Sequence, residues 1–141
     1  MKVRAVLVCG GRDFNDAERA FAVLDGVARE LGLAGFFVRI VTGDAAGADA
    51  LAARWAQRTK SLCDVYPAEW SKHGRKAGPL RNQRMLDENL VAMVVAFPGG
   101  RGTADMVRRA DAARIEVRRV QLKPYPGQGC YPKGLKFGGV S

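Results

Sequence analysis

Residues 3–12 have the sequence VRAVLVCGGR, an apolar run that ends in two glycines. A short run that is apolar at almost every position is typical of a strand buried on both faces of a parallel sheet. The two glycines predict a tight turn at the carboxyl end of that strand, before a helix begins. Residues 3–12 therefore predict the first strand and turn of an α/β domain.

Strand-like and helix-like segments alternate along the rest of the chain, which favours parallel strands joined by right-handed crossovers. We predict five strands, at about residues 3–9, 36–41, 62–66, 91–97 and 117–122. We predict four helices, over about residues 15–31, 48–60, 79–89 and 103–114. The fold class is thus α/β: a single Rossmann-like domain, residues 1–122, with a five-stranded parallel sheet and helices on both faces. Residues 123–141, rich in Pro, Gly and Lys, predict an extended tail.

Local signals suggest where the helices begin and end. Asn15 or Asp16 is expected to cap the first helix and Gly32 to end it. Thr103 is expected to cap the last helix. Residues 68–78 hold two glycines and several charges, which predicts a loop.

Composition excludes several classes of protein. No apolar run reaches the length of a membrane span, and the N-terminus does not resemble a signal peptide. Cys9, Cys63 and Cys130 form no CxxC pair, and His73 is the only histidine, so we expect neither a metal site nor a disulfide framework. These observations predict a cytoplasmic protein without a membrane partner.

The 141-residue chain carries 23 basic and 14 acidic side chains, a net charge of +9. The excess gathers in residues 70–86 and 120–141, which contain no acidic residue. Such a distribution favours an anionic partner, either a nucleotide or a nucleic acid, although a face that only aids solubility would have the same composition.

Glycine-rich turns follow three of the predicted strands. Because the carboxyl ends of parallel strands share one edge of the sheet, the three turns together predict a phosphate-binding site. The candidate ligand-binding residues in these turns are Gly10, Gly11, Arg12, Thr42, Gly43, Asp44, Gly47, Asp49, Pro98, Gly99, Gly100, Gly102 and Thr103. Neither GxxxxGK[ST] nor a GxGxxG after the first strand is present, which argues against a Walker A loop and the usual dinucleotide fingerprint. Each turn taken alone is equally typical of an ordinary strand-to-helix connection.

Side chains outside the glycine turns complete the predicted site. Arg81 and Asn82 fall in the first turn of a predicted helix, where an arginine fork could grip a phosphate. Asp49 could accept hydrogen bonds from ribose hydroxyls or simply favour the start of its helix. Trp70 and His73 could stack on a base, and His73 could equally be only exposed.

The PGGRGT sequence of residues 98–103, with Arg81 upstream, resembles the PGGxGT signature of the Lonely Guy phosphoribohydrolases. These enzymes belong to the SLOG superfamily, which also includes the DNA-processing protein DprA. An ordered set of motifs over about residues 3–120 is similar to the YspA or YpsA-related SLOG branch: GGRDF (10–14), TGDAAGAD (42–49), PAEW (67–70) and GPLRN (78–82). The resemblance implies a Rossmann-like fold, a nucleotide or nucleotide-derived ligand and a homo-oligomer.

The sequence departs from the Lonely Guy pattern at one position. PGGxGT is followed in those enzymes by a catalytic glutamate, and Met106 stands at that position here. Asp105 lies one residue early, about 100° around the helix, and is a poor substitute. Glu69, Asp44 or Asp49 could supply a carboxylate from another loop. We therefore favour a binding or sensing module, with a nucleotide phosphoribohydrolase or related hydrolase, and a DprA-like binder of single-stranded nucleic acid, as the alternatives.

Overall fold

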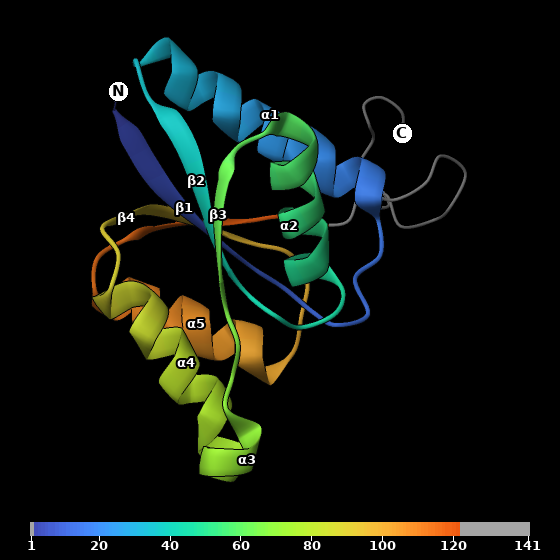
Figure 1. The fold of residues 1–141 in the computed structure, drawn as a ribbon, viewed down its shortest axis with the longest axis vertical. Helices are drawn as coiled ribbons and strands as arrows, with labels where there is room; N and C mark the ends of the chain where they lie inside the picture. Colours follow the sequence, from blue (N-terminus) through green and yellow to red (C-terminus); the bar gives the residue numbers. More distant parts are fainter. Residues whose placement is uncertain (1, 122–141) are drawn as a thin grey trace, which may run out of the picture.

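A computed structural model describes residues 2–121 of the chain (Figure 1). The strands are β1 (Val3–Cys9), β2 (Phe37–Gly43), β3 (Leu62–Tyr66), β4 (Val91–Ala96) and β5 (Glu116–Arg119). The helices are α1 (Ala17–Leu33), α2 (Ala48–Thr59), α3 (Trp70–His73), α4 (Ala77–Asp87) and α5 (Arg101–Ala112), with a 3-10 turn, η1, at Gly74–Lys76. All strand pairs are parallel, and the sheet order is β3-β2-β1-β4-β5. The predicted α/β fold with a five-stranded parallel sheet is confirmed.

Helices cover both faces of the sheet. Figure 1 shows α1 and α2 on one side and α4 and α5 on the other. Successive residues of β1 point to opposite faces of the sheet. Val6 and Val8 pack in the core under α1 and α2, while Ala5 and Leu7 pack in the core under α4 and α5. Because side chains alternate across a strand, a central strand with two cores must be apolar at nearly every position. This is why residues 5–9 show no polar alternation.

The predicted helix ends are partly confirmed. Asp16 caps α1, and its carboxylate accepts a hydrogen bond of 3.0 Å from the Arg19 amide. The predicted end at Gly32 is wrong, because α1 continues to Leu33 and the glycine with positive φ is Gly35. The predicted Thr103 cap is also wrong: α5 begins at Arg101 and its N-cap is Gly100.

The loop predicted over residues 68–78 contains ordered secondary structure. The amides of Lys72 and His73 both donate to the Glu69 carbonyl, which closes one helical turn as α3. Gly74 then takes a positive φ of 59°, and the chain continues through η1 into α4. None of the side chains of α3 and η1 is buried, so no apolar spacing marked them. The segment projects beyond α4, away from the sheet (Figure 1).

Between residues 2 and 121, no helix has the length and apolarity needed to cross a membrane. The predicted tail at residues 123–141 lies outside the described residues.

Candidate functional site

A cavity of about 1200 Å³ opens at the carboxyl edge of the sheet. Its walls come from the β1–α1 loop, the β2–α2 turn, the α3–α4 segment and the β4–α5 turn. The predicted residues that line it are Gly10, Gly11, Arg12, Gly43, Asp49, Arg81, Asn82, Pro98, Gly99, Gly100, Gly102 and Thr103. The structure thus brings the three glycine turns and the start of α4 together around one space.

Two predicted ligand-binding residues lie behind the cavity wall instead. Thr42 is fully buried, and its single hydroxyl proton is shared between the Val8 carbonyl at 2.8 Å and the Asp49 carboxylate at 3.1 Å. Gly47 has a φ of 78°, and a Cβ there would overlap the carbonyl oxygens of Gly11 and Arg12. Both residues hold the β2–α2 turn against the β1–α1 loop.

The three candidate carboxylates are placed very differently. Asp49 lines the cavity. Asp44 does not, although its half-exposed carboxylate lies 3.8 Å from a guanidinium nitrogen of Arg81. Glu69 also lies outside the lining, where its carboxylate is 3.7 Å from the His73 ring. Only Asp49 of the three borders the space that a ligand could fill.

Most of the glycines that line the cavity allow the β1–α1, β2–α2 and β4–α5 turns to pack against one another. A Cβ on Gly10 would lie 2.5 Å from the Ala48 Cβ and 2.8 Å from the Phe97 Cβ. A Cβ on Gly99 would lie 2.6 Å from the amide nitrogen of Gly11, which donates to the Pro98 carbonyl at 2.8 Å. These positions exclude any side chain because protein atoms already occupy the space.

Gly100 and Gly102 differ from those glycines. A Cβ on either would meet no protein atom within 4 Å among the described residues. Gly100 is the N-cap of α5, and no side chain caps the helix there. The amino end of α5 therefore faces open space in the cavity wall.

Arg81 crosses the floor of the cavity from the first half of α4. Its Nη1 donates to the Tyr66 carbonyl at 3.1 Å, and its Nε donates to the side-chain oxygen of Asn82 at 3.1 Å. A Cβ on Gly43 would lie 2.7 Å from a carboxylate oxygen of Asp49 and 2.8 Å from the guanidinium carbon of Arg81. Gly43 thus leaves room for Arg81 and Asp49 at the end of β2.

A buried polar network links Arg81 to α5. Asn82, which is buried, donates to the Gly102 carbonyl at 3.2 Å and to the Asp105 carboxylate at 3.0 Å. Arg109 and Arg108 donate to the two Asp105 oxygens at 2.8 and 2.7 Å. Burial alone would raise the Asp105 pKa, but the hydrogen bonds from Arg109 and Asn82 outweigh it, so the pKa is lowered.

Asp105 is the cavity residue that sequence reasoning set aside. It lines the cavity, whereas Met106 is fully buried in the core beneath α4 and α5. Motif counting gave the position of the missing glutamate but not the face of the helix that meets the cavity. The amphipathic pattern of α5 carried that information, since Met106, Val107 and Ala110 form the apolar face that packs in the core.

Two further titratable groups in the lining are buried. Burial raises the pKa of Asp49, and hydrogen bonds from the Ala45 amide and the Thr42 hydroxyl, together with the charge of Arg81, oppose the rise. Burial, with a smaller contribution from the Asp49 charge, raises the pKa of Cys9 to about 12. Cys9 is therefore a protonated, unreactive thiol at neutral pH, as expected of a buried cysteine.

The rim of the cavity carries aromatic and basic side chains. Trp70, Arg75 and Arg101 line it together with Arg12. Among residues 2–121, none of these three arginines forms an ion pair. In that same part of the chain, no group of three or more His, Cys, Asp and Glu side chains is arranged to hold a metal ion. These arginines are available to an anionic ligand, while Asp13, Asp16 and Glu18 bring negative charge to the same lining.

Comparison with known proteins adds two matches. Residues 4–73 match the family described as YspA, cpYpsA-related SLOG. The chain is 36% identical over 129 residues to the Gene 61 protein of Mycobacterium phage D29, a match that covers 86% of this chain and 100% of the phage protein. No solved structure matches the chain significantly.

Proposed function

Since this chain belongs to the YspA, cpYpsA-related SLOG family, we propose that its cavity binds a nucleotide or a phosphoribosyl- or ADP-ribosyl-type derivative. Membership of this family suggests binding or processing of a nucleotide-related ligand in general terms. The proposal assigns the phosphate to the amino end of α5 and the side chain of Arg81.

The observation that carries the proposal is the uncapped amino end of α5 beside Arg81. The first amides of a helix lack acceptors within the helix and attract an anion. Gly100 leaves open space in front of these amides. Asn82 connects the first turn of α5 to Arg81, because its side chain donates to the Gly102 carbonyl and accepts from Arg81. A phosphate there would receive backbone amides and a charged guanidinium at once.

Met106 and Asp105, at and beside the position of the Lonely Guy glutamate, favour binding over hydrolysis. Asp105 already accepts three hydrogen bonds, and its lowered pKa keeps it ionised, so it has no proton to donate as a general acid. Met106 lies in the core and faces no ligand. A module that binds or senses a nucleotide fits this arrangement better than a phosphoribohydrolase.

Calorimetric titration with AMP, ADP-ribose and NAD tests the proposal. Arg81→Ala should weaken binding of whichever nucleotide binds by roughly ten- to a hundredfold, because it removes a charge-assisted hydrogen bond. The matched control is Arg84→Ala, which removes an arginine from the same helix that is exposed and pairs with Glu88. Equal affinity of the wild type and Arg81→Ala would place the ligand elsewhere.

Single-stranded nucleic acid is the competing partner in this experiment. Neutralisation of several phosphates releases counterions, so its binding would weaken steeply as salt rises. A single-stranded oligonucleotide that binds more tightly than all three nucleotides, with such a salt dependence, would overturn the proposal.

A further inference from the structure

The two tryptophans of the chain have opposite environments. Trp55 in α2 is 3% exposed, and its indole nitrogen donates to Asp25 at 2.8 Å. Trp70 in α3 is 48% exposed and lines the cavity. One indole therefore belongs to the core, and the other presents a large part of its surface at the mouth of the cavity.

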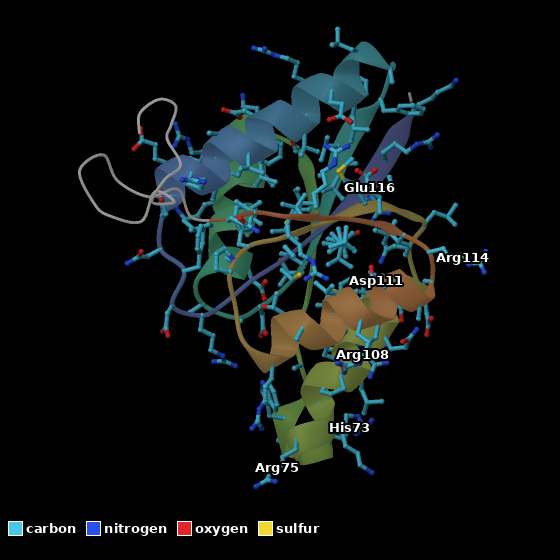
Figure 2. The ribbon with its side chains drawn as sticks, turned by 180° about the vertical axis from the view of Figure 1, so that it is seen from behind. His73, Arg75, Arg108, Asp111, Arg114 and Glu116 are labelled. Atoms are coloured by element: carbon cyan, nitrogen blue, oxygen red, sulfur yellow. The ribbon has the colours of Figure 1, made fainter. Side chains whose placement is uncertain are left out.

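Trp70 leaves about half of its surface outside the packing of the fold. The segment that carries it, α3 and η1, buries none of its side chains. Figure 2 shows His73 and Arg75 of this segment at the far end of the molecule from the sheet. A tryptophan that is half exposed on such a segment has apolar surface available for a partner.

The position of Trp70 relative to Arg81 is set by α4. A Cβ on Gly78 would lie 3.4 Å from Cη2 of the indole, so the Trp70 ring sits against the surface of α4 at Gly78. Gly78 and Arg81 are three residues apart, which makes them neighbours on one side of the helix. Both residues line the cavity. The backbone positions of Gly78, which the indole contacts, and of Arg81 are thus separated by roughly 4.5 Å along the axis of α4.

We infer that Trp70 is the platform on which the base of the nucleotide stacks. This inference rests on the proposed function and specifies the end of the ligand remote from the phosphate. Aromatic side chains bind bases through their π faces, and a purine offers more stacking area than a pyrimidine. The segment of α3 and η1 would then select the base while α5 and Arg81 hold the phosphate.

Titration of the full chain with AMP, CMP and ribose 5-phosphate tests the inference, with calorimetry and tryptophan emission recorded together. AMP should quench the emission of Trp70, while Trp55, which is buried, continues to emit. AMP should also bind roughly ten- to a hundredfold more tightly than ribose 5-phosphate, and CMP should fall between them. Trp70→Leu should bring the AMP affinity close to that of ribose 5-phosphate. The matched control, Leu80→Ala, changes an exposed apolar residue of α4 outside the cavity lining and should leave the AMP affinity unchanged.

The outcomes separate this inference from the proposed function. If AMP binding requires Arg81 but neither quenches emission nor weakens in Trp70→Leu, the base lies elsewhere and only the stacking inference fails. If CMP and AMP both bind no more tightly than ribose 5-phosphate, the base adds no affinity and the stacking inference fails. If AMP, CMP and ribose 5-phosphate all fail to bind the wild type, the inference falls together with its premise.

Discussion

Arg81 lies so close to Gly43 that a Cβ on the glycine would stand 2.8 Å from the guanidinium carbon. Gly43 ends β2, and Arg81 comes from a helix almost forty residues later. The position of the guanidinium in the cavity floor therefore depends on a missing side chain in another element.

Gly43→Ala is expected to displace Arg81 and to weaken AMP binding about as much as Arg81→Ala does, since the Arg81 guanidinium and a methyl group on residue 43 cannot occupy the same space. Calorimetric titration measures the effect. Gly26→Ala serves as the control, because a Cβ on Gly26 of α1 meets no protein atom within 4 Å. That substitution should leave binding unchanged and stabilise the fold by about 0.5–1 kcal/mol. Unaltered binding by Gly43→Ala would show that Arg81 can act from another position.

Met106→Glu is expected to destabilise the protein by more than about 4 kcal/mol, because it would place a carboxylate among apolar side chains under α4 and α5. Urea denaturation followed by circular dichroism measures the loss. Met106→Leu, which nearly conserves volume, should cost less than about 1.5 kcal/mol. If the Met106→Glu protein unfolded at the same urea concentration as the wild type, α5 would have to be able to turn this position toward the cavity.

Asp105→Asn is expected to cost about 1–3 kcal/mol of stability at pH 7, because it removes the charge that Arg108 and Arg109 pair with. The folded pKa of Asp105 is lowered, so the carboxylate contributes stability above the unfolded pKa of about 3.9 and loses it as the pH falls through the folded value. The difference between wild type and variant should accordingly shrink between pH 7 and pH 3 in urea denaturation.

Asp111→Asn is the control for the measurements on Asp105→Asn between pH 7 and pH 3. Asp111 lies on the same helix, but its exposed carboxylate is 4.0 Å from Arg119, so the change should stay within about 0.5 kcal/mol. A difference between wild type and Asp105→Asn that does not vary with pH would contradict the assignment of stability to the Asp105 charge.

The sequence revealed the strands because β1 and β4 are buried on both faces and are apolar at nearly every position. It also revealed that the glycine turns share an edge, which follows from a parallel sheet. It did not reveal α3, because its turn is closed by backbone hydrogen bonds to Glu69 and has no buried side chain. Composition likewise could not show that Gly10 and Gly99 accommodate neighbouring turns, since that depends on long-range packing.

Other expectations from the sequence stay predictions. Ligand binding by the predicted residues and assembly into a homo-oligomer both await measurement. The structure adds the placement of Asp105: the helix starts at Arg101, Met106 lies in the apolar core, and Asp105 is buried beside the cavity, where it pairs with arginines of the same helix. A motif defines the spacing of residues along the chain, but the packing of the helix determines which of them meets the cavity.

The central place of β1 has a consequence for how the chain folds during synthesis. β1 leaves the ribosome first, and it pairs with β2 on one side and with β4, more than eighty residues later, on the other. Until β4 emerges, the backbone N–H and C=O groups of Val6, Leu7 and Val8 that would face β4 have no partner, and the apolar side chains beside them are uncovered. Exposed apolar edges pair readily with other chains. We therefore expect nascent or truncated chains that end after β3 to aggregate, while chains that extend through β5 remain in solution.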